Sequence, residues 1–234
     1  MEPFLDGDDT GVGEEIATAL TALEGRFRDE FSDDDLTGVP EVMWRAGVAY
    51  QCLYRRTVES AVGVKLAWKA GNLITVVTMA RSLLETGAIA WRLTDHIEKA
   101  LEKKDAAELY AAIMKISFGN RVNLIEEKEE EYRAVNILTA IEHMNTGILK
   151  GKEESFIDIY NCLSEIAHPN HWGILGLYGN HIEAEERIEF GNKHRKDDLW
   201  WMIGPALCVV WMVNDLAEEF EKKLLPAMAE LVAK

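Results

Sequence analysis

The sequence predicts an all-α protein, folded as a single-domain helical bundle of five to seven helices over residues 1–234. Three observations predict this fold class. Apolar residues recur at spacings of three and four along most of the chain, which is the period of an amphipathic helix. The chain has 234 residues and 48% hydrophobic content, enough for one sizeable core. No internal repeat or low-complexity linker divides it, so one domain is the economical interpretation.

Turn signals between the periodic stretches place the helices in order. The expected helices are residues 14–31, 41–70, 73–103, a region from about 106, 134–147, 153–167, and a last one from about 197 to 231. Residues 1–13 are expected to form a flexible N-terminus. Pro40 suits the first turn of the second helix, and Gly71 suits its end. Pro205 is expected to kink the last helix.

A different pattern appears around residues 174–192. Three glycines are spaced by three in "GILGLYG", and apolar and charged residues then alternate between Ile182 and Phe190. Period-two alternation is typical of strands, so we expect a small β-hairpin-like insertion here. The run "EEKEEE" at 126–131 indicates a solvated helix face.

Composition excludes some classes of function. The formal net charge of −16 opposes sequence-independent attraction to nucleic acid and to anionic lipid. Residues 199–213 are uncharged but number only 15, which is short of a membrane span, and Arg81 and Glu85 interrupt the apolar run 73–91. We therefore expect no membrane association. The three cysteines lack metal-type spacing and indicate buried, reduced thiols in a cytoplasmic protein.

Two charged residues stand out in the third helix. Between residues 73 and 91 only Arg81 and Glu85 are charged, and a helix that is apolar nearly all round is normally central. They are one turn apart, so their side chains can meet. Either they neutralise each other within the core, or the guanidinium binds an anionic ligand and the carboxylate serves catalysis.

The expected helix 153–167 carries a second polar group and is followed by a proline. Asn161, Ser164, Glu165 and His168 lie within about 100° of one another on the helix. Pro169, Asn170 and His171 follow, and the proline makes His168 a natural helix terminus. The stripe is either plain solvent-facing surface, with His168 as a C-terminal cap, or the border of a site that a neighbouring helix closes.

Metal sites receive little support from the sequence. Glu165 and His168 have the i, i+3 spacing of a bundle metal ligand pair, but only one such pair occurs, and a dinuclear site needs two. Glu85, Glu165, His168 and His171 leave a mononuclear site open as an alternative. We expect neither a metal nor another cofactor.

The segments "ARSLLETGA" (80–88) and "YNCLSEIAHPN" (160–170) resemble an uncharacterised family of bacterial all-helical proteins. Its members carry an Arg-x-x-x-Glu central helix and a later Leu-Ser-Glu-x-x-His-Pro segment. The resemblance implies a bundle similar in style to HEPN domains, several of which are ribonucleases or toxin–antitoxin partners. The HEPN ribonuclease signature pairs an arginine with a histidine a few residues on. Here the comparable spacing is Arg187 to His194, and isoleucine follows the arginine.

These observations give one structural hypothesis and two functional ones. We expect Arg81 and Glu85 to face Ser164, Glu165 and His168 across one partly buried site. In the favoured interpretation the protein is a non-catalytic regulatory or interaction module, whose polar cluster fixes packing or binds a small anionic ligand through Arg81, Ser164, Asn170 and His171. The alternative is a metal-independent ribonuclease, with His168 as general acid or base and Glu165 or Glu85 orienting it. The expected partners are a second copy or another protein, and not nucleic acid.

Overall fold

The computed structural model describes residues 12–30, 40–118, 134–149, 155–182, 186–191 and 196–233, and every structural statement below concerns these residues. The elements in order are α1 (Val12–Glu24), α2 (Glu41–Lys69), α3 (Leu73–Lys103), α4 (Ala106–Phe118), α5 (Ile137–Ile148), α6 (Phe156–Ala167), a π-helical turn (Trp172–Gly176), β1 (Gly179–Ile182), β2 (Arg187–Phe190), α7 (Lys196–Glu219), a second π-helical turn (Phe220–Leu224) and α8 (Leu225–Val232). Because α7 continues through the second π-turn into α8, the described residues form seven helical rods, a short helical segment at residues 171–178, and one hairpin. The predicted all-α bundle is confirmed.

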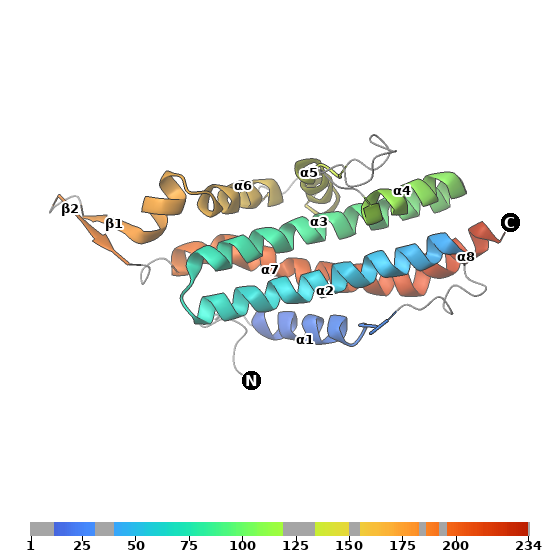
Figure 1. Cartoon of the computed structure of the whole chain (residues 1–234), viewed down its shortest axis with the longest axis horizontal. Coiled ribbons are helices and arrows are strands. Elements are labelled where there is room, and N and C mark those ends of the chain that lie inside the picture. The colour runs from blue at the N-terminus through green and yellow to red at the C-terminus, as the bar shows by residue number, and fades with distance from the viewer. Residues whose placement is uncertain are drawn as a thin grey trace.

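Helix α3 lies at the centre of the bundle. It packs against α2, α7, α4, α5 and α6, and its buried residues include Leu83 and Leu84 at 0% exposure. Figure 1 shows α2 and α7 running alongside it, with α1 beneath and α4 to α6 above. A sequence stretch with only two charges therefore occupies the central position of the bundle.

The connection between α2 and α3 follows the sequence signals. Gly71 adopts a positive φ of 70°, a conformation that glycine takes without steric cost, directly after the end of α2. The side chain of Asn72 then accepts a hydrogen bond from the backbone N–H of Thr75 at 3.2 Å and caps α3. The predicted bounds of α2 and α3 agree with the structure to within one residue.

The predicted bounds of the first helix and of the hairpin were wrong. Helix α1 ends at Glu24 and not near residue 31, and it already begins at Val12, so residues 12–13 belong to a helix. Residues 171–178 are helical, and the hairpin is confined to residues 179–190. The first two glycines of "GILGLYG", Gly173 and Gly176, therefore belong to a helical turn, and the third, Gly179, begins β1. The acidic run 126–131 and residues 1–11 lie outside the described residues.

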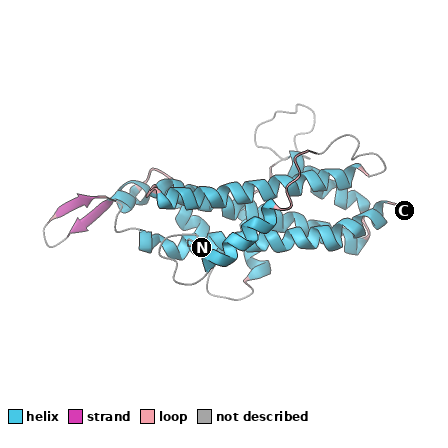
Figure 2. Ribbon diagram, turned by 90° about the horizontal axis from the view of Figure 1, so that it is seen from below, coloured by secondary structure: helices cyan, strands magenta, loops and turns pink. Residues whose placement is uncertain are grey.

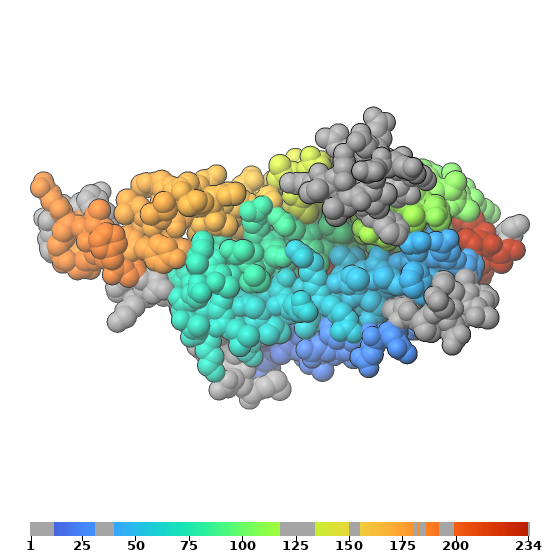
Figure 3. All heavy atoms as spheres, viewed as in Figure 1, coloured from blue at the N-terminus to red at the C-terminus, as the bar shows by residue number. Residues whose placement is uncertain are grey.

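The hairpin projects from one end of the bundle. Strands β1 and β2 pair antiparallel, with Gly179 opposite Phe190 and Ile182 opposite Arg187. Figure 2 shows the two strands standing beyond the helices, at the end of the molecule opposite the C-terminus. The space-filling view of Figure 3 shows the same segment extending past the body of the protein.

Two helices are long and apolar enough to cross a membrane by length and composition. They are Leu73–Lys103 and the continuous helix Leu199–Val232, and 56% of the most apolar stretch of each is buried inside the fold. The last helix is longer than the uncharged run 199–213 because it continues through the second π-turn into α8, in agreement with the predicted extent of about 197 to 231. Pro205 lies inside α7 and cannot donate a backbone N–H to the helix. The nearby residues Ile203 and Ala206 are fully buried.

The cysteines are free thiols in different environments. Cys52 is exposed, against the expectation of a buried thiol, whereas Cys162 and Cys208 are partly buried. Burial raises the pKa of both the Cys162 and the Cys208 thiols. These two thiols are therefore poorer nucleophiles at neutral pH than an ordinary cysteine.

Candidate functional site

Arg81 and Glu85 of α3 meet α6 through the hydroxyl of Tyr160. The guanidinium Nε of Arg81 donates to Oε1 of Glu85 at 3.1 Å, and its Nη2 donates to Oη of Tyr160 at 3.1 Å. The Tyr160 hydroxyl donates in turn to Oε1 of Glu85, also at 3.1 Å. We call these three residues the Arg–Glu–Tyr triangle. It joins the central helix to α6 by a closed ring of hydrogen bonds.

Tyr160 was not among the predicted site residues, because it lies next to the buried residues Ile159 and Leu163 of α6. Its ring is indeed buried, at 5% exposure, and the Arg81 guanidinium carbon lies 5.2 Å from the ring centroid. The hydroxyl at the tip reaches the charged pair, as is usual for an amphipathic side chain. Tyr160 precedes Ser164 by one turn on the same face, and that spacing was the available signal.

A second polar link holds α3 to α2. Arg56 of α2 donates from Nε to Oγ1 of Thr86 and from Nη2 to Oγ of Ser82, both at 3.0 Å. Ser82 and Thr86 each follow a triangle residue by one position in the sequence. The middle of α3 therefore carries arginine-mediated links to helices on two sides.

The polar stripe of α6 does not join the triangle. The carboxylate of Glu165 is directed to the following turn, where its Oε2 accepts a hydrogen bond from Nδ2 of Asn170 at 2.6 Å. The hydroxyl of Ser164 is buried but has no hydrogen-bond partner. Glu165, His168 and Asn161 are exposed. The stripe is thus mainly the solvent-facing surface that the sequence left open as an alternative.

The His-Pro-Asn segment forms a turn between two helices. His168 adopts an extended conformation, with φ −84° and ψ 147°, as expected for a residue before proline. The side-chain Oδ1 of Asn170 accepts a hydrogen bond from the backbone N–H of Gly173 at 3.0 Å, and so caps the helical segment 171–178. Asn170 thus has a structural role that accounts for both of its side-chain contacts.

Gly173 is required by the close approach of this turn to α6. A Cβ at residue 173 would lie 1.9 Å from the carbonyl oxygen of His168 and 2.6 Å from that of Ile166. No side chain fits at such distances, so the backbone of the second helix can approach the end of α6 only with glycine here. The glycine spacing noted in "GILGLYG" has a packing cause at its first member.

Among the described residues, no hydrogen bond or ion pair joins Arg81 or Glu85 to Ser164, Glu165 or His168, so the predicted single site is not formed as expected. Arg81 and Glu85 do face α6, but their partner is Tyr160. The imidazoles of His168 and His171 are exposed, and the His171 ring packs edge-on to Trp172 at 6.3 Å between centroids. Because His168 ends the helix and precedes a proline, its side chain leaves the α3–α6 contact. A guanidinium–imidazole pocket under an apolar cover is not formed.

The structure also bears on two other sites considered in the sequence analysis, the metal site and the HEPN-type arginine–histidine pair. In the described part of the chain, no group of three or more His, Cys, Asp or Glu side chains is arranged to hold a metal ion. Arg187, the arginine of the HEPN-type spacing, lies in β2 and is paired with Glu189, and His194 lies outside the described residues.

The triangle is suited to packing more than to catalysis. The side chains of Arg81 and Glu85 are 28% and 27% exposed, so water reaches the pair but does not surround it. The guanidinium charge is matched by the carboxylate, and the tyrosine hydroxyl both accepts and donates. Each removed partner would leave a partly buried polar group unsatisfied, which costs more than the intact bond contributes.

The chain matches no protein-family model, no curated protein and no solved structure with significant similarity.

Proposed function

We propose that the protein is a non-catalytic interaction module that works as a homodimer, with the projecting segment 171–190 as its interface. The observation that carries this proposal is the concentration of exposed apolar side chains there. Of the ten large apolar side chains exposed among the described residues, six belong to this segment: Trp172, Ile174, Leu175, Tyr178, Ile188 and Phe190. Such clustering on one protrusion is typical of a protein–protein contact.

The hairpin also calls for a partner on structural grounds. All four residues of β2 are exposed, and a two-stranded hairpin is marginally stable without further support. Among the described residues the sheet has two strands, so the edge of β2 that faces away from β1 has no neighbouring strand. An open edge of this kind is a template for adding another strand.

The backbone of β2 presents its hydrogen-bonding groups in a defined pattern. The backbone N–H of Gly191 donates to the carbonyl of Tyr178 at 2.9 Å, one step beyond the pairing of Gly179 with Phe190. Alternate residues of an antiparallel strand direct their N–H and C=O groups to opposite edges. Ile188 and Phe190 therefore direct theirs away from β1, towards a second strand.

The side chains of β2 favour a second copy as that strand. If two β2 strands pair antiparallel about a two-fold axis at Ile188, Arg187 of one chain lies opposite Glu189 of the other, twice. Opposite charges directly across an antiparallel pair stabilise it. This local complementarity offsets the repulsion between two chains that each carry −16. Two-fold dimers are also the commonest oligomers of soluble proteins.

Analytical ultracentrifugation tests the proposal. The protein is expected to sediment with twice the chain mass of 26.4 kDa at micromolar concentration. Arg187→Glu and Glu189→Arg should each give monomers, and the double variant carrying both changes should dimerise again. An equimolar mixture of the two single variants should form a heterodimer. Arg45→Glu, which disturbs the Glu41–Arg45 pair of α2 instead, is the matched control and should stay dimeric. A monomeric wild type, or a double variant that stays monomeric, would refute this interface.

A further inference from the structure

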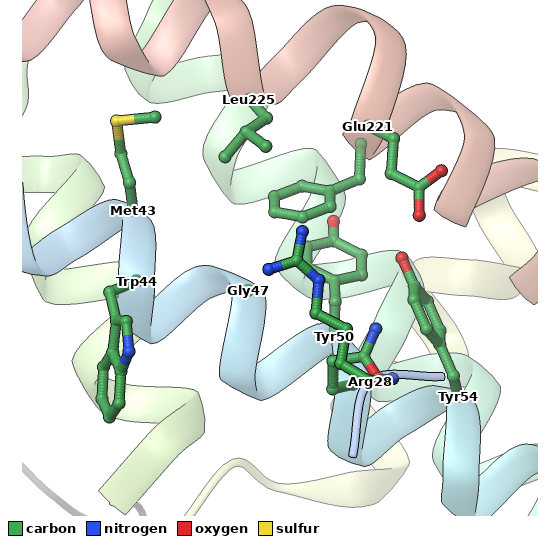
Figure 4. A pocket seen from close by; sticks show the side chains of 10 residues that line it. Arg28, Met43, Trp44, Gly47, Tyr50, Tyr54, Glu221 and Leu225 are labelled. Carbon is green, nitrogen blue, oxygen red and sulfur yellow. The ribbon is translucent and has the colours of Figure 1, made fainter. Parts of the chain in front are cut away.

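A cavity of about 300 Å³ lies between the chain that follows α1, the first half of α2 and the second π-turn. Figure 4 shows the side chains that line it. Most of them are aromatic or aliphatic: Met43, Trp44, Tyr50, Tyr54, Phe220 and Leu225. An apolar cavity of roughly 150 Å³ holds one benzene ring, so this cavity has room for two fused rings.

The aromatic rings of the wall are held in place by their neighbours. The Phe220 ring stacks on the Tyr50 ring with 3.8 Å between centroids, and the Tyr50 ring lies 5.9 Å from that of Tyr54. The Tyr50 hydroxyl lies 2.7 Å from Oγ1 of Thr94, which holds this row of rings to the central helix. A ligand therefore need not order these side chains when it binds, and avoids that entropic cost.

Phe220 reaches the cavity from an irregular part of its helix. It begins the π-turn Phe220–Leu224, and Leu225, the first residue after the turn, lines the cavity as well. Single π-turns within long α-helices are frequent at functional sites. The irregularity of this helix thus coincides with the cavity.

Gly47 also lines the cavity, in the interior of α2. Glycine is unfavourable inside a helix because it loses more backbone freedom on folding than any other residue. The other glycine of α2, Gly63, has a packing cause, since a Cβ there would lie 3.2 Å from the side chain of Met79. At residue 47 the lack of a side chain instead leaves space at the cavity.

The polar groups of the lining are either engaged or closed to the cavity. Glu221 forms an ion pair with Arg26, and Arg28 is likewise not without a partner. The Gln51 amide accepts from the backbone N–H of Arg28 at 2.9 Å and donates to the Arg26 carbonyl at 2.8 Å. The Tyr54 hydroxyl is closed to solvent. A charged ligand would therefore lose its hydration here without gaining a counter-ion.

We propose that this cavity is a binding site for a small, neutral aromatic molecule, of the size of two fused rings. The ring system of the ligand packs against the aromatic and aliphatic walls. Its binding free energy comes from the apolar surface that ligand and cavity remove from water. The site is separate from the dimer interface proposed above and does not depend on it.

Isothermal titration calorimetry with indole, indole-3-acetate and tryptamine tests the charge preference, in about 0.15 M salt to screen the net charge of the protein. Indole is neutral, whereas indole-3-acetate is an anion and tryptamine a cation. We expect indole to bind with a Kd on the order of 0.1–1 mM, and each charged probe at least about fivefold more weakly. No binding of indole, or equal or tighter binding of either charged probe, would overturn the proposal.

NMR of the tryptophan indole N–H signals tests the location. Indole should shift the signal of Trp44, which lines the cavity, and leave that of Trp172, on the projecting segment, unchanged. Trp44→Phe and Trp172→Phe assign the two signals. A shift of the Trp172 signal in place of the Trp44 signal would place the probe on the exposed apolar side chains of the projecting segment, and would refute the site.

Substitutions of Gly47 test whether the space beside α2 is the binding site. Gly47→Leu should weaken indole binding at least about tenfold because the new side chain takes up that space, and leucine favours a helix more than glycine. Gly47→Ala should weaken binding about twofold while it raises the thermal midpoint. Glu59→Leu, at an exposed position of the same helix, is the matched control and should bind indole normally. Unchanged affinity in both Gly47 variants would contradict this location.

Discussion

The hydroxyl of Tyr160 in α6 lies 3.1 Å from Nη2 of Arg81 in α3, although the two residues are 79 positions apart in the chain. The same hydroxyl donates to Glu85, so one phenol closes the contact between the central helix and α6. The charges of Arg81 and Glu85 already balance each other, so the contribution of the Tyr160 hydroxyl is to orient α6 relative to α3. It fixes the rotation of α6 against α3, and hence the direction in which the projecting segment leaves the bundle.

Tyr160→Phe is expected to lower the free energy of unfolding by about 1 kcal/mol, because it removes two hydrogen bonds at a partly exposed site while keeping the ring. Urea denaturation followed by circular dichroism measures the change. Tyr110→Phe in α4 removes an exposed hydroxyl and should leave the midpoint unchanged. Equal midpoints for the two variants would mean that the triangle contributes no stability.

Asn170→Ala and His168→Ala should differ in stability although the residues are two positions apart. Asn170 caps the segment 171–178 and bonds Glu165, so its loss should cost about 1 kcal/mol. His168 is exposed, so its truncation should stay within about 0.5 kcal/mol. Thermal unfolding of both variants checks this order. A larger loss for His168→Ala would show that the imidazole has a contact not seen here.

Two glycine substitutions should change stability in opposite directions. Gly173→Ala places a Cβ 1.9 Å from the His168 carbonyl oxygen, so the turn must move, and hydrogen exchange at the end of α6 should accelerate markedly. Gly204→Ala in α7 meets only Trp200 at an ordinary 3.7 Å, so it should raise stability by about 0.5–1 kcal/mol through helix propensity. Native-state hydrogen exchange and urea unfolding report the two effects. Unaltered exchange in Gly173→Ala would contradict the observed packing.

Thr94→Val should leave the buried Tyr50 hydroxyl without its partner and cost about 1–2 kcal/mol. The matched control is Thr57→Val in α2. Thr57 is equally buried, but its hydroxyl bonds only the Leu53 carbonyl of its own helix, and no second side chain is left unsatisfied. Chemical denaturation of both variants should therefore show the larger loss for Thr94→Val, and the reverse order would count against this account of Tyr50.

His96 should make the protein less stable in mild acid. Burial lowers the pKa of His96 below 6.5, and the charge of Arg92 lowers the pKa further. The unfolded chain therefore binds a proton more readily than the native protein. Stability is unaffected by this residue above pH 6.5 and is lost as the pH falls from 6.5 through the folded-state pKa. Between pH 7 and pH 5, unfolding free energies of His96→Gln should fall less steeply than those of the wild type. Parallel pH curves would refute this contribution.

The sequence by itself determined the helical class, the bounds of α2 and α3, and the central place of α3. These features depend on local chemistry: Gly71 permits the turn, Asn72 caps the next helix, and the near absence of charge in 73–91 requires burial on all sides. The pairing of Arg81 with Glu85 also follows from spacing within one helix. The alternation of apolar and charged residues also predicted a hairpin, and strand β2 lies at Arg187–Phe190.

Only the tertiary structure decided which side chains from distant helices meet. Tyr160 lies at the edge of the polar stripe of α6, one turn before Ser164, so the sequence did not show which of these polar groups meets α3. Contact with α3 selects the face that holds Tyr160 and leaves His168 exposed beyond the end of α6. A cavity lined by Tyr54 of α2 and Phe220 of the second π-turn (Figure 4) likewise joins segments far apart in the chain, a proximity that arises from packing and not from any local pattern.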